Sequence, residues 1–287
     1  NGYAALGANT TGNQNIAIGT NALDANTTAN HNIAIGFAAL GVNETGTQNV
    51  AVGNFSLDAN TANNNTAVGY HSLGSNTTGT ENVGIGGYAS YLNTTGTHSV
   101  AVGYTALYSN TTGARHVAVG RRALNSNTTG ANNTRVGFDS LLSNTTGTDN
   151  VAVGANALDA NTTGSYNNAV GKNALGSNTT GERNSAFGNT AFNNNTTGSY
   201  NAGFGANALY FNTTGANNAA FGYGAIQNNT TGMHNVAVGA NALDANTTGN
   251  FNASLGSKSL TSNNGSYNVA VGYETLETNS SGQYNTA

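Results

Sequence analysis

The sequence contains no cysteine and little charge, since only 6% of its 287 residues are Asp, Glu, Lys or Arg. Without cysteine the chain forms neither disulfides nor thiolate metal sites. The formal net charge of −4 argues against a surface that binds nucleic acid. No apolar run is long enough to span a membrane, and we expect no signal peptide. These absences argue against nucleic-acid partners and against membrane insertion.

A repeated unit occupies the whole chain. Its glycine recurs every 17 residues, and the step shortens to 16 only after Gly53 and Gly256. Residues 151–167 give the unit as Val-Ala-Val-Gly-Ala-Asn-Ala-Leu-Asp-Ala-Asn-Thr-Thr-Gly-Ser-Tyr-Asn. A period this short and regular is typical of a solenoid, and apolar residues held in fixed phase exclude disorder. We therefore predict an all-β parallel β-solenoid, or β-roll, of about seventeen coils in one continuous array over residues 1–287.

Each unit predicts two short strands separated by corners. The segment Asn-Val-Ala-Val-Gly alternates large and small apolar residues, which is the pattern of a strand. Asn-Ala-Leu suggests a second strand, and the repeat glycine and the Asn-Thr-Thr-Gly run suggest the corners. Helix is disfavoured because glycine and β-branched residues recur every few positions.

The alternation also leads to a prediction about assembly. We expect the large residues on either side of the strand Ala to point inward, and Leu158 and its equivalents to face them from the second strand. Three consecutive coils carry Phe before the glycine and a small residue two positions earlier, which suggests a shared packed space. The Ala between the large residues would then point outward and form an assembly face. That predicted face consists of Ala17, Ala34, Ala51, Ala101, Ala118, Ala152, Ala169, Ala186 and Ala237.

An Asn stands seven residues after every repeat glycine. It predicts either a ladder of side-chain amides or sites of N-glycosylation, because most copies lie in Asn-x-Thr/Ser. Asn60 and Asn263 persist where that sequon is lost, which favours the ladder. The candidate positions are Asn9, Asn26, Asn76, Asn93, Asn110, Asn127, Asn144, Asn161, Asn178, Asn195, Asn212, Asn229 and Asn246.

Residues that could act in catalysis or in metal or ligand binding are scattered along the sequence. The histidines are joined by no carboxylate cluster, so we expect no enzyme, no metal and no cofactor. Arg122 and Asp139 share a phase on neighbouring coils and predict a surface ion pair. Some tyrosines directly follow the repeat glycine and could stack on sugar rings or simply cover a corner. These candidate ligand-facing aromatics are Tyr70, Tyr104, Tyr223 and Tyr273.

The repeat resembles known extracellular repeats. Residues 150–154 and 235–239, both Asn-Val-Ala-Val-Gly, resemble the core motif of the heads of trimeric autotransporter adhesins. The longer string Gly-x-Asn-Ala-Leu-x-x-Asn-Thr-Thr-Gly resembles repeats of phage tail-fibre-like and bacterial surface proteins. The resemblance implies a left-handed roll, three chains around one axis, and a place on a cell surface or virion.

We therefore expect a structural component of an extracellular fibre or filament. The chain begins and ends inside a repeat without a capping sequence, so we expect a piece of a longer array, or head-to-tail stacking, beside or instead of a homotrimer. The alternative is an adhesin head that binds a glycan or a receptor on a host surface. A third interpretation, suggested by the Thr rows, is an ice-binding solenoid.

Overall fold

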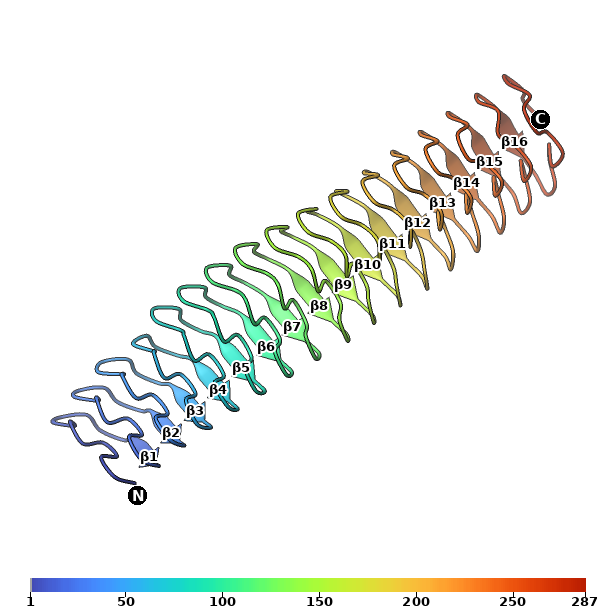
Figure 1. The fold of residues 1–287 in the computed structure, drawn as a ribbon. Helices are drawn as coiled ribbons and strands as arrows, with labels where there is room; N and C mark the ends of the chain where they lie inside the picture. The colour runs from blue at the N-terminus through green and yellow to red at the C-terminus, as the bar shows by residue number, and fades with distance from the viewer. Residues whose placement is uncertain (1) are drawn as a thin grey trace. The chain divides into compact units, whose positions relative to one another are not determined.

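The computed structural model describes residues 2–287 and contains strands and turns, with no helix in that range. Its 16 strands are three residues long and run parallel. The chain divides into two compact units, Asn1–Thr146 and Gly147–Ala287, which are described separately. In each unit the coils stack one on the next in sequence order (Figure 1). The predicted all-β parallel solenoid is confirmed.

The strands follow the repeat. The first unit contains β1 (Ile16–Ile18), β2 (Ile33–Ile35), β3 (Val50–Val52), β4 (Thr66–Val68), β5 (Val83–Ile85), β6 (Val100–Val102), β7 (Val117–Val119) and β8 (Thr134–Val136). The second contains β9 (Val151–Val153), β10 (Asn168–Val170), β11 (Ser185–Phe187), β12 (Ala202–Phe204), β13 (Ala219–Phe221), β14 (Val236–Val238), β15 (Ala253–Leu255) and β16 (Val269–Val271).

Neighbouring strands pair in strict register within each unit. Ala17 pairs with Ala34 in the first unit, and Ala152 pairs with Ala169 in the second. Equivalent positions of successive repeats therefore form straight ladders, as the fixed period predicts. Where a coil is one residue shorter, as between β3 and β4, the pairing stays in register, so the missing residue is absorbed outside the strand.

The direction of the strand side chains was predicted wrongly. The middle residue of the strand lies inside the coil and its neighbours point outward: Ala152 is 0% exposed and Val153 is 36% exposed. A ladder buried by its own chain offers no assembly face. The residues concerned are Ala34, Ala51, Ala101, Ala118, Ala152, Ala169, Ala186 and Ala237, which are buried, and Ala17, which is half-buried.

The width of the coil explains this reversal. The interior is filled by Leu four residues after the glycine, as predicted, together with the Ala before that Leu. In most coils little more than a methyl group is found opposite, and Arg135 is an exception. At Gly84, a Cβ would lie 3.2 Å from Leu73 Cγ. Where Phe192 replaces the Leu, the next coil carries Gly203, and a Cβ there would collide with the ring. Volume is conserved in the interior, between these two positions.

The segment after the repeat glycine forms a turn instead of the predicted second strand. Asn156 has φ 55° and Leu158 has φ 53°, and equivalent residues of the other coils are also left-handed. A third left-handed residue, Tyr166 (φ 61°), lies near the opposite corner. Each such non-glycine residue costs on the order of 1 kcal/mol. The backbone still bonds between coils, for example from Leu158 N–H to Ala174 O at 3.0 Å.

The repeat glycine makes a corner that no other residue fits. Gly154 has φ +131°, and a Cβ there would lie 2.6 Å from the carbonyl oxygen of Gly171 in the next coil. Both the dihedral and the close approach require glycine. The predicted corner role of this residue is confirmed.

Candidate functional surfaces

The outward residues of the strands form an apolar surface in each unit. We call this the outer sheet face: the first and third residues of β1–β8 in the first unit and of β9–β16 in the second. None of these residues is charged. The third is always Val, Ile, Phe or Leu, and the first is apolar except at Thr66, Thr134, Asn168 and Ser185. Most are half-buried or exposed; Ile18 is 48% exposed and Leu255 is 51% exposed. A contiguous apolar surface of this kind marks an interaction site.

Three phenylalanines of the outer sheet face stack on one another. Phe187 and Phe204 have ring centroids 4.9 Å apart, and Phe204 and Phe221 have centroids 5.1 Å apart, with interplanar angles of 4° and 3°. The first residue of the same strands is Ser185, Ala202 or Ala219. On these three strands the third residue is larger and the first residue is smaller, so the total side-chain volume on the outer sheet face stays roughly constant. The predicted compensation between these rows exists, but on the outside of the coil.

The Asn ladder is confirmed. Asn178 Nδ2 donates to Asn161 Oδ1 at 2.8 Å and to the carbonyl oxygen of Gly181 at 3.0 Å, and its Oδ1 accepts from Asn195 Nδ2 at 2.8 Å. The same amide-to-amide bond joins other neighbouring coils at 2.7–3.0 Å. These side chains are buried, except for Asn9 in the first coil, which is exposed, and Asn279 in the last, which is half-buried. Glycosylation is therefore the wrong interpretation for the buried members, because their amide nitrogens face inward and are already used.

A second Asn ladder was missed by sequence analysis. It consists of the Asn directly before each strand: Asn167 Nδ2 donates to Gly181 O at 2.8 Å, and Asn184 N–H donates to Asn167 Oδ1 at 3.0 Å. Gly181 O therefore accepts from both ladders, which uses both lone pairs of the carbonyl. The signal was in the sequence, because this Asn recurs with the same period and changes only at Ser99 and His116.

His116 replaces an Asn of the second ladder and is buried. Its Nδ1 accepts a hydrogen bond from Asn133 N–H at 3.4 Å. Burial lowers the pKa of His116 from 6.5 to about 4. The neutral imidazole thus fits the fold and the charged form does not.

Acidification should destabilise the coils around His116. The pKa is lower in the folded than in the unfolded state, so stability is retained above pH 6.5 and is lost as the pH falls towards 4. The loss should reach about 3 kcal/mol. Hydrogen exchange of coil amides at several pH values measures it. His116→Asn, which restores the ladder residue, should remove this pH dependence, whereas His31→Asn at an exposed site should not. An equal slope in wild type and His116→Asn contradicts the prediction.

Arg135 occupies the position of the buried Ala in β8. Its side chain is fully buried and Nη2 lies 3.4 Å from Ser140 Oγ, while Nε and Nη1 have no hydrogen-bond partner. Burial lowers the pKa of this guanidinium, and the nearby Asp139 raises it. Asp139 itself pairs with Arg122 at 3.2 Å, which confirms that predicted ion pair.

The candidate tyrosines are exposed but do not form one site. Tyr70 and Tyr104 belong to a group of aromatic side chains in the first unit, in which Tyr88 lies against both rings. Tyr223 and Tyr273 lie in the second unit and are 58% and 67% exposed. The aromatic neighbours Tyr88, Tyr91 and Tyr108 were not predicted, because they stand at other positions of the repeat.

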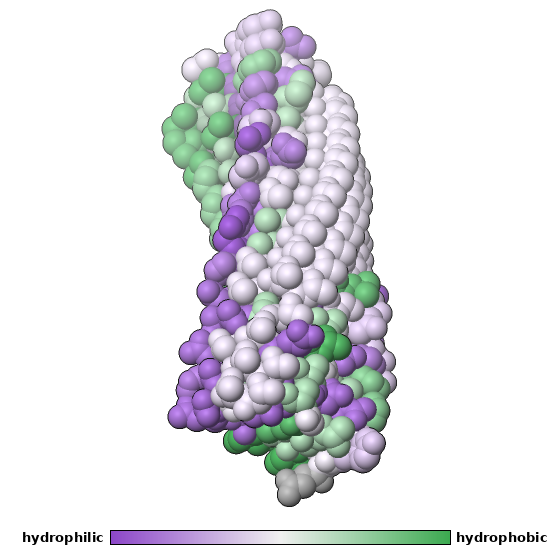
Figure 2. All heavy atoms as spheres, turned by 90° about the vertical axis from the view of Figure 1, so that its left-hand side faces the viewer, coloured by the Kyte–Doolittle hydropathy of each residue, from purple (hydrophilic) through white to green (hydrophobic). Residues whose placement is uncertain are grey.

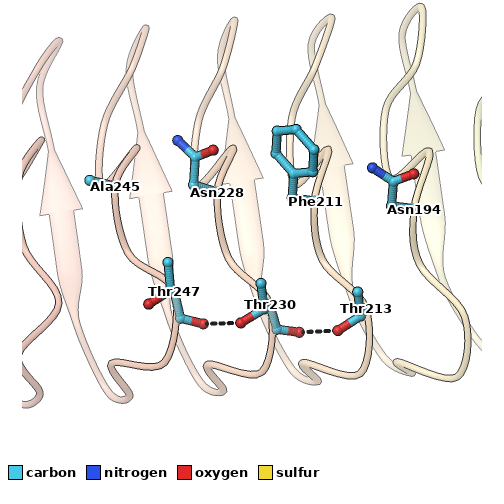
Figure 3. Close-up of a pocket in the computed structure, with 7 residues that line it drawn as sticks. All are labelled: Asn194, Phe211, Thr213, Asn228, Thr230, Ala245 and Thr247. Atoms are coloured by element: carbon cyan, nitrogen blue, oxygen red, sulfur yellow. Dashed lines mark hydrogen bonds between the residues drawn. The ribbon is translucent and has the colours of Figure 1, made fainter.

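The Thr that directly follows most ladder Asn residues belongs to an ordered row. Thr213 Oγ1 donates to Thr230 O at 2.9 Å, and Thr230 Oγ1 donates to Thr247 O at 3.0 Å. Figure 3 shows this row beside Asn194, Phe211, Asn228 and Ala245, with which it lines a shallow groove of about 540 Å³. Figure 2 shows regular rows of side chains of intermediate hydropathy on one face, beside a hydrophilic band and hydrophobic patches.

Residues 2–287 contain no group of three or more His, Cys, Asp or Glu residues placed to hold a metal ion. In the same range no helix has the length and apolarity needed to cross a bilayer. No protein-family model matches the chain, and no curated protein matches its sequence. The assignment of function therefore depends on the surfaces described above.

Proposed function

We propose that the chain is a structural rod segment of an extracellular fibre and that copies associate side by side through the outer sheet face. The observation that carries the proposal is the exposure of an uncharged, apolar strand surface in each unit. Transfer of apolar surface from water stabilises by about 25 cal/mol per Å², so ladders of Val, Ile and Phe provide a strong driving force. The residues that the repeat keeps apolar outside the coil would then be kept for assembly.

The partner favoured by these observations is a second copy of the chain. Both units carry the same outer sheet face, and it is free of charge, so identical surfaces meet without repulsion or buried unpaired ions. A homotrimer around one axis, as the adhesin resemblance implies, is the arrangement we propose. Cell surface or virion is the proposed location. Ice binding is less favoured, because hydroxyls of the Thr row already donate to the backbone.

The experiment is a measurement of oligomer mass by light scattering on the wild-type chain and two charged variants. The wild type should have a mass that is a multiple of the 28.7 kDa chain, and three copies for a trimer. Val153→Glu/Phe204→Glu, which adds two carboxylates to the outer sheet face, should shift the population towards 28.7 kDa.

The matched control is Thr163→Glu/Thr214→Glu, which adds the same charges to exposed positions on the same coils. It should assemble like the wild type. Circular dichroism should show that both variants keep the fold. A wild-type chain that stays at 28.7 kDa at every concentration, or equal assembly of both variants, rejects the proposal.

A further inference from the structure

Five consecutive coils of the first unit carry an unusual density of aromatic side chains. Their rings touch in a continuous series with centroid distances of 4.4–6.4 Å. They stand in the turn after the repeat glycine, not on the strands, so they are separate from the outer sheet face. We call them the aromatic cluster: Phe37, Phe55, Tyr70, His71, Tyr88, Tyr91, Tyr104 and Tyr108.

Tyr88 forms one wall of a hollow in this cluster. Tyr88, Tyr104, Thr105 and Tyr108 line a space of about 370 Å³. The ring of Tyr88 is almost perpendicular to that of Tyr104 (89°) and is inclined by 58° to that of Tyr108. The three rings are thus walls around a space and are not stacked face to face.

Gly87 interrupts the row of side chains that directly follow the repeat glycine. It stands at the position that Tyr70 and Tyr104 occupy in the coils before and after it. Its φ does not require glycine, and a Cβ there would meet the ring of Tyr104 only at 3.4 Å, an ordinary contact. A small residue is therefore required at this position neither by the backbone nor by the packing, and the ring of Tyr88 lies against both Tyr70 and Tyr104 instead.

The lining selects a ligand by its chemistry. All four lining residues are uncharged and each carries a hydroxyl group. Tyrosine offers an apolar ring face and a polar edge in one side chain. A sugar ring presents the complementary pair: a face of C–H groups and a rim of hydroxyls. An organic cation would also be attracted to the rings, but unlike a sugar it would make no hydrogen bonds to the hydroxyls.

We propose that the Tyr88 hollow binds one ring of a neutral oligosaccharide and that the aromatic cluster extends the site to neighbouring sugar rings. Successive coils lie about 4.8 Å apart, so the cluster offers a new aromatic side chain at each small step along the first unit. The first unit would then hold a glycan at a fixed place, in addition to its proposed part in the fibre. This inference does not depend on self-association, because the oligomer mass and the sugar affinity are measured separately.

The test is titration calorimetry of the full chain with neutral β-1,4-linked hexasaccharides of glucose, mannose and xylose. We expect at least one of the three to bind. The double variant Tyr88→Asn/Tyr104→Ala places repeat residues at both positions, as in Asn156 and Ala155, so the fold should be kept. It should lower the affinity at least about tenfold. Gly87→Tyr, which adds a side chain against the ring of Tyr104, should weaken binding in the same way without removing a tyrosine.

Tyr223→Ala, at an exposed site in the second unit, is the matched control and should bind like the wild type. The chain lacks tryptophan, so quenching of tyrosine fluorescence gives an independent readout. The proposal is overturned if none of the hexasaccharides binds at millimolar concentration or if Tyr88→Asn/Tyr104→Ala binds as well as the wild type. Displacement of the sugar by tetramethylammonium, with tighter binding of the cation than of any sugar, would also overturn it.

Discussion

Replacing Asn178 by alanine should lower the free energy of unfolding by about 4 kcal/mol. The substitution removes two donated hydrogen bonds, to Asn161 Oδ1 and Gly181 O, and one accepted from Asn195. Each of these three buried hydrogen bonds contributes about 1–1.5 kcal/mol, although Gly181 O still accepts from Asn167 and Asn195 Nδ2 still donates to Gly198 O. Stacked coils unfold locally, so hydrogen exchange of amides in this coil and its neighbours is the appropriate measurement.

Asn178→Asp separates shape from hydrogen bonding. Aspartate has nearly the same volume, but an ionised carboxylate cannot donate to Asn161 Oδ1 or Gly181 O. It should destabilise at least as much as alanine at neutral pH and recover partly in acid. Thr180→Ala, at an exposed position two residues away, should stay within about 0.5 kcal/mol of the wild type. Equal, small effects of all three substitutions would show that the ladder contributes little.

Replacing Arg135 by alanine should have a large effect of opposite sign. The guanidinium is fully buried, and two of its nitrogens have no hydrogen-bond partner. Alanine is the residue at this position in the neighbouring coil, at Ala118, so the backbone accepts it. Removal of a buried, poorly compensated charge should raise stability by about 2–4 kcal/mol.

The control for Arg135 is an exposed arginine of the preceding coil. Arg121→Ala removes the same charge from the surface and should change stability by less than about 1 kcal/mol. Chemical denaturation and local hydrogen exchange should both report the gain at Arg135. A decrease in stability for Arg135→Ala would mean that Ser140 and Asp139 compensate the buried charge, and our account of this coil would be wrong.

Periodicity predicted the fold well because it fixes the register. The 17-residue step is enough to place Ala152 beside Ala169, and the persistence of Asn60 outside a sequon predicted the amide ladder. The direction of the strand side chains failed, since alternation tells which residues share a side but not which side is inside. The usual expectation that the larger apolar residue is buried misled the prediction.

Sequence differences between coils indicate which side of the strand faces the interior. Phe192 is followed in the next coil by Gly203, so the larger side chain is matched by the loss of the side chain opposite. This linked change identifies two positions that face one another across the interior. The left-handed backbone at Leu158 had no such signal, because leucine rarely adopts it and only the narrow coil requires it. The Tyr88 hollow combines three different repeat positions, so a search along one position could not find it.

Because the ladders are in register, the array can gain or lose residues without disruption when it gains or loses a complete coil. A gene that gains or loses one complete repeat still encodes a chain in which each Asn, glycine and buried Ala meets its equivalent. A gain of one residue inside a strand would exchange its inner and outer sides. Recombination between repeats can therefore lengthen or shorten the array in single coils, and selection can act on length almost independently of stability. The tolerated one-residue losses, after Thr61 and beside Asn264, lie in the corner, where such errors do no harm to the register.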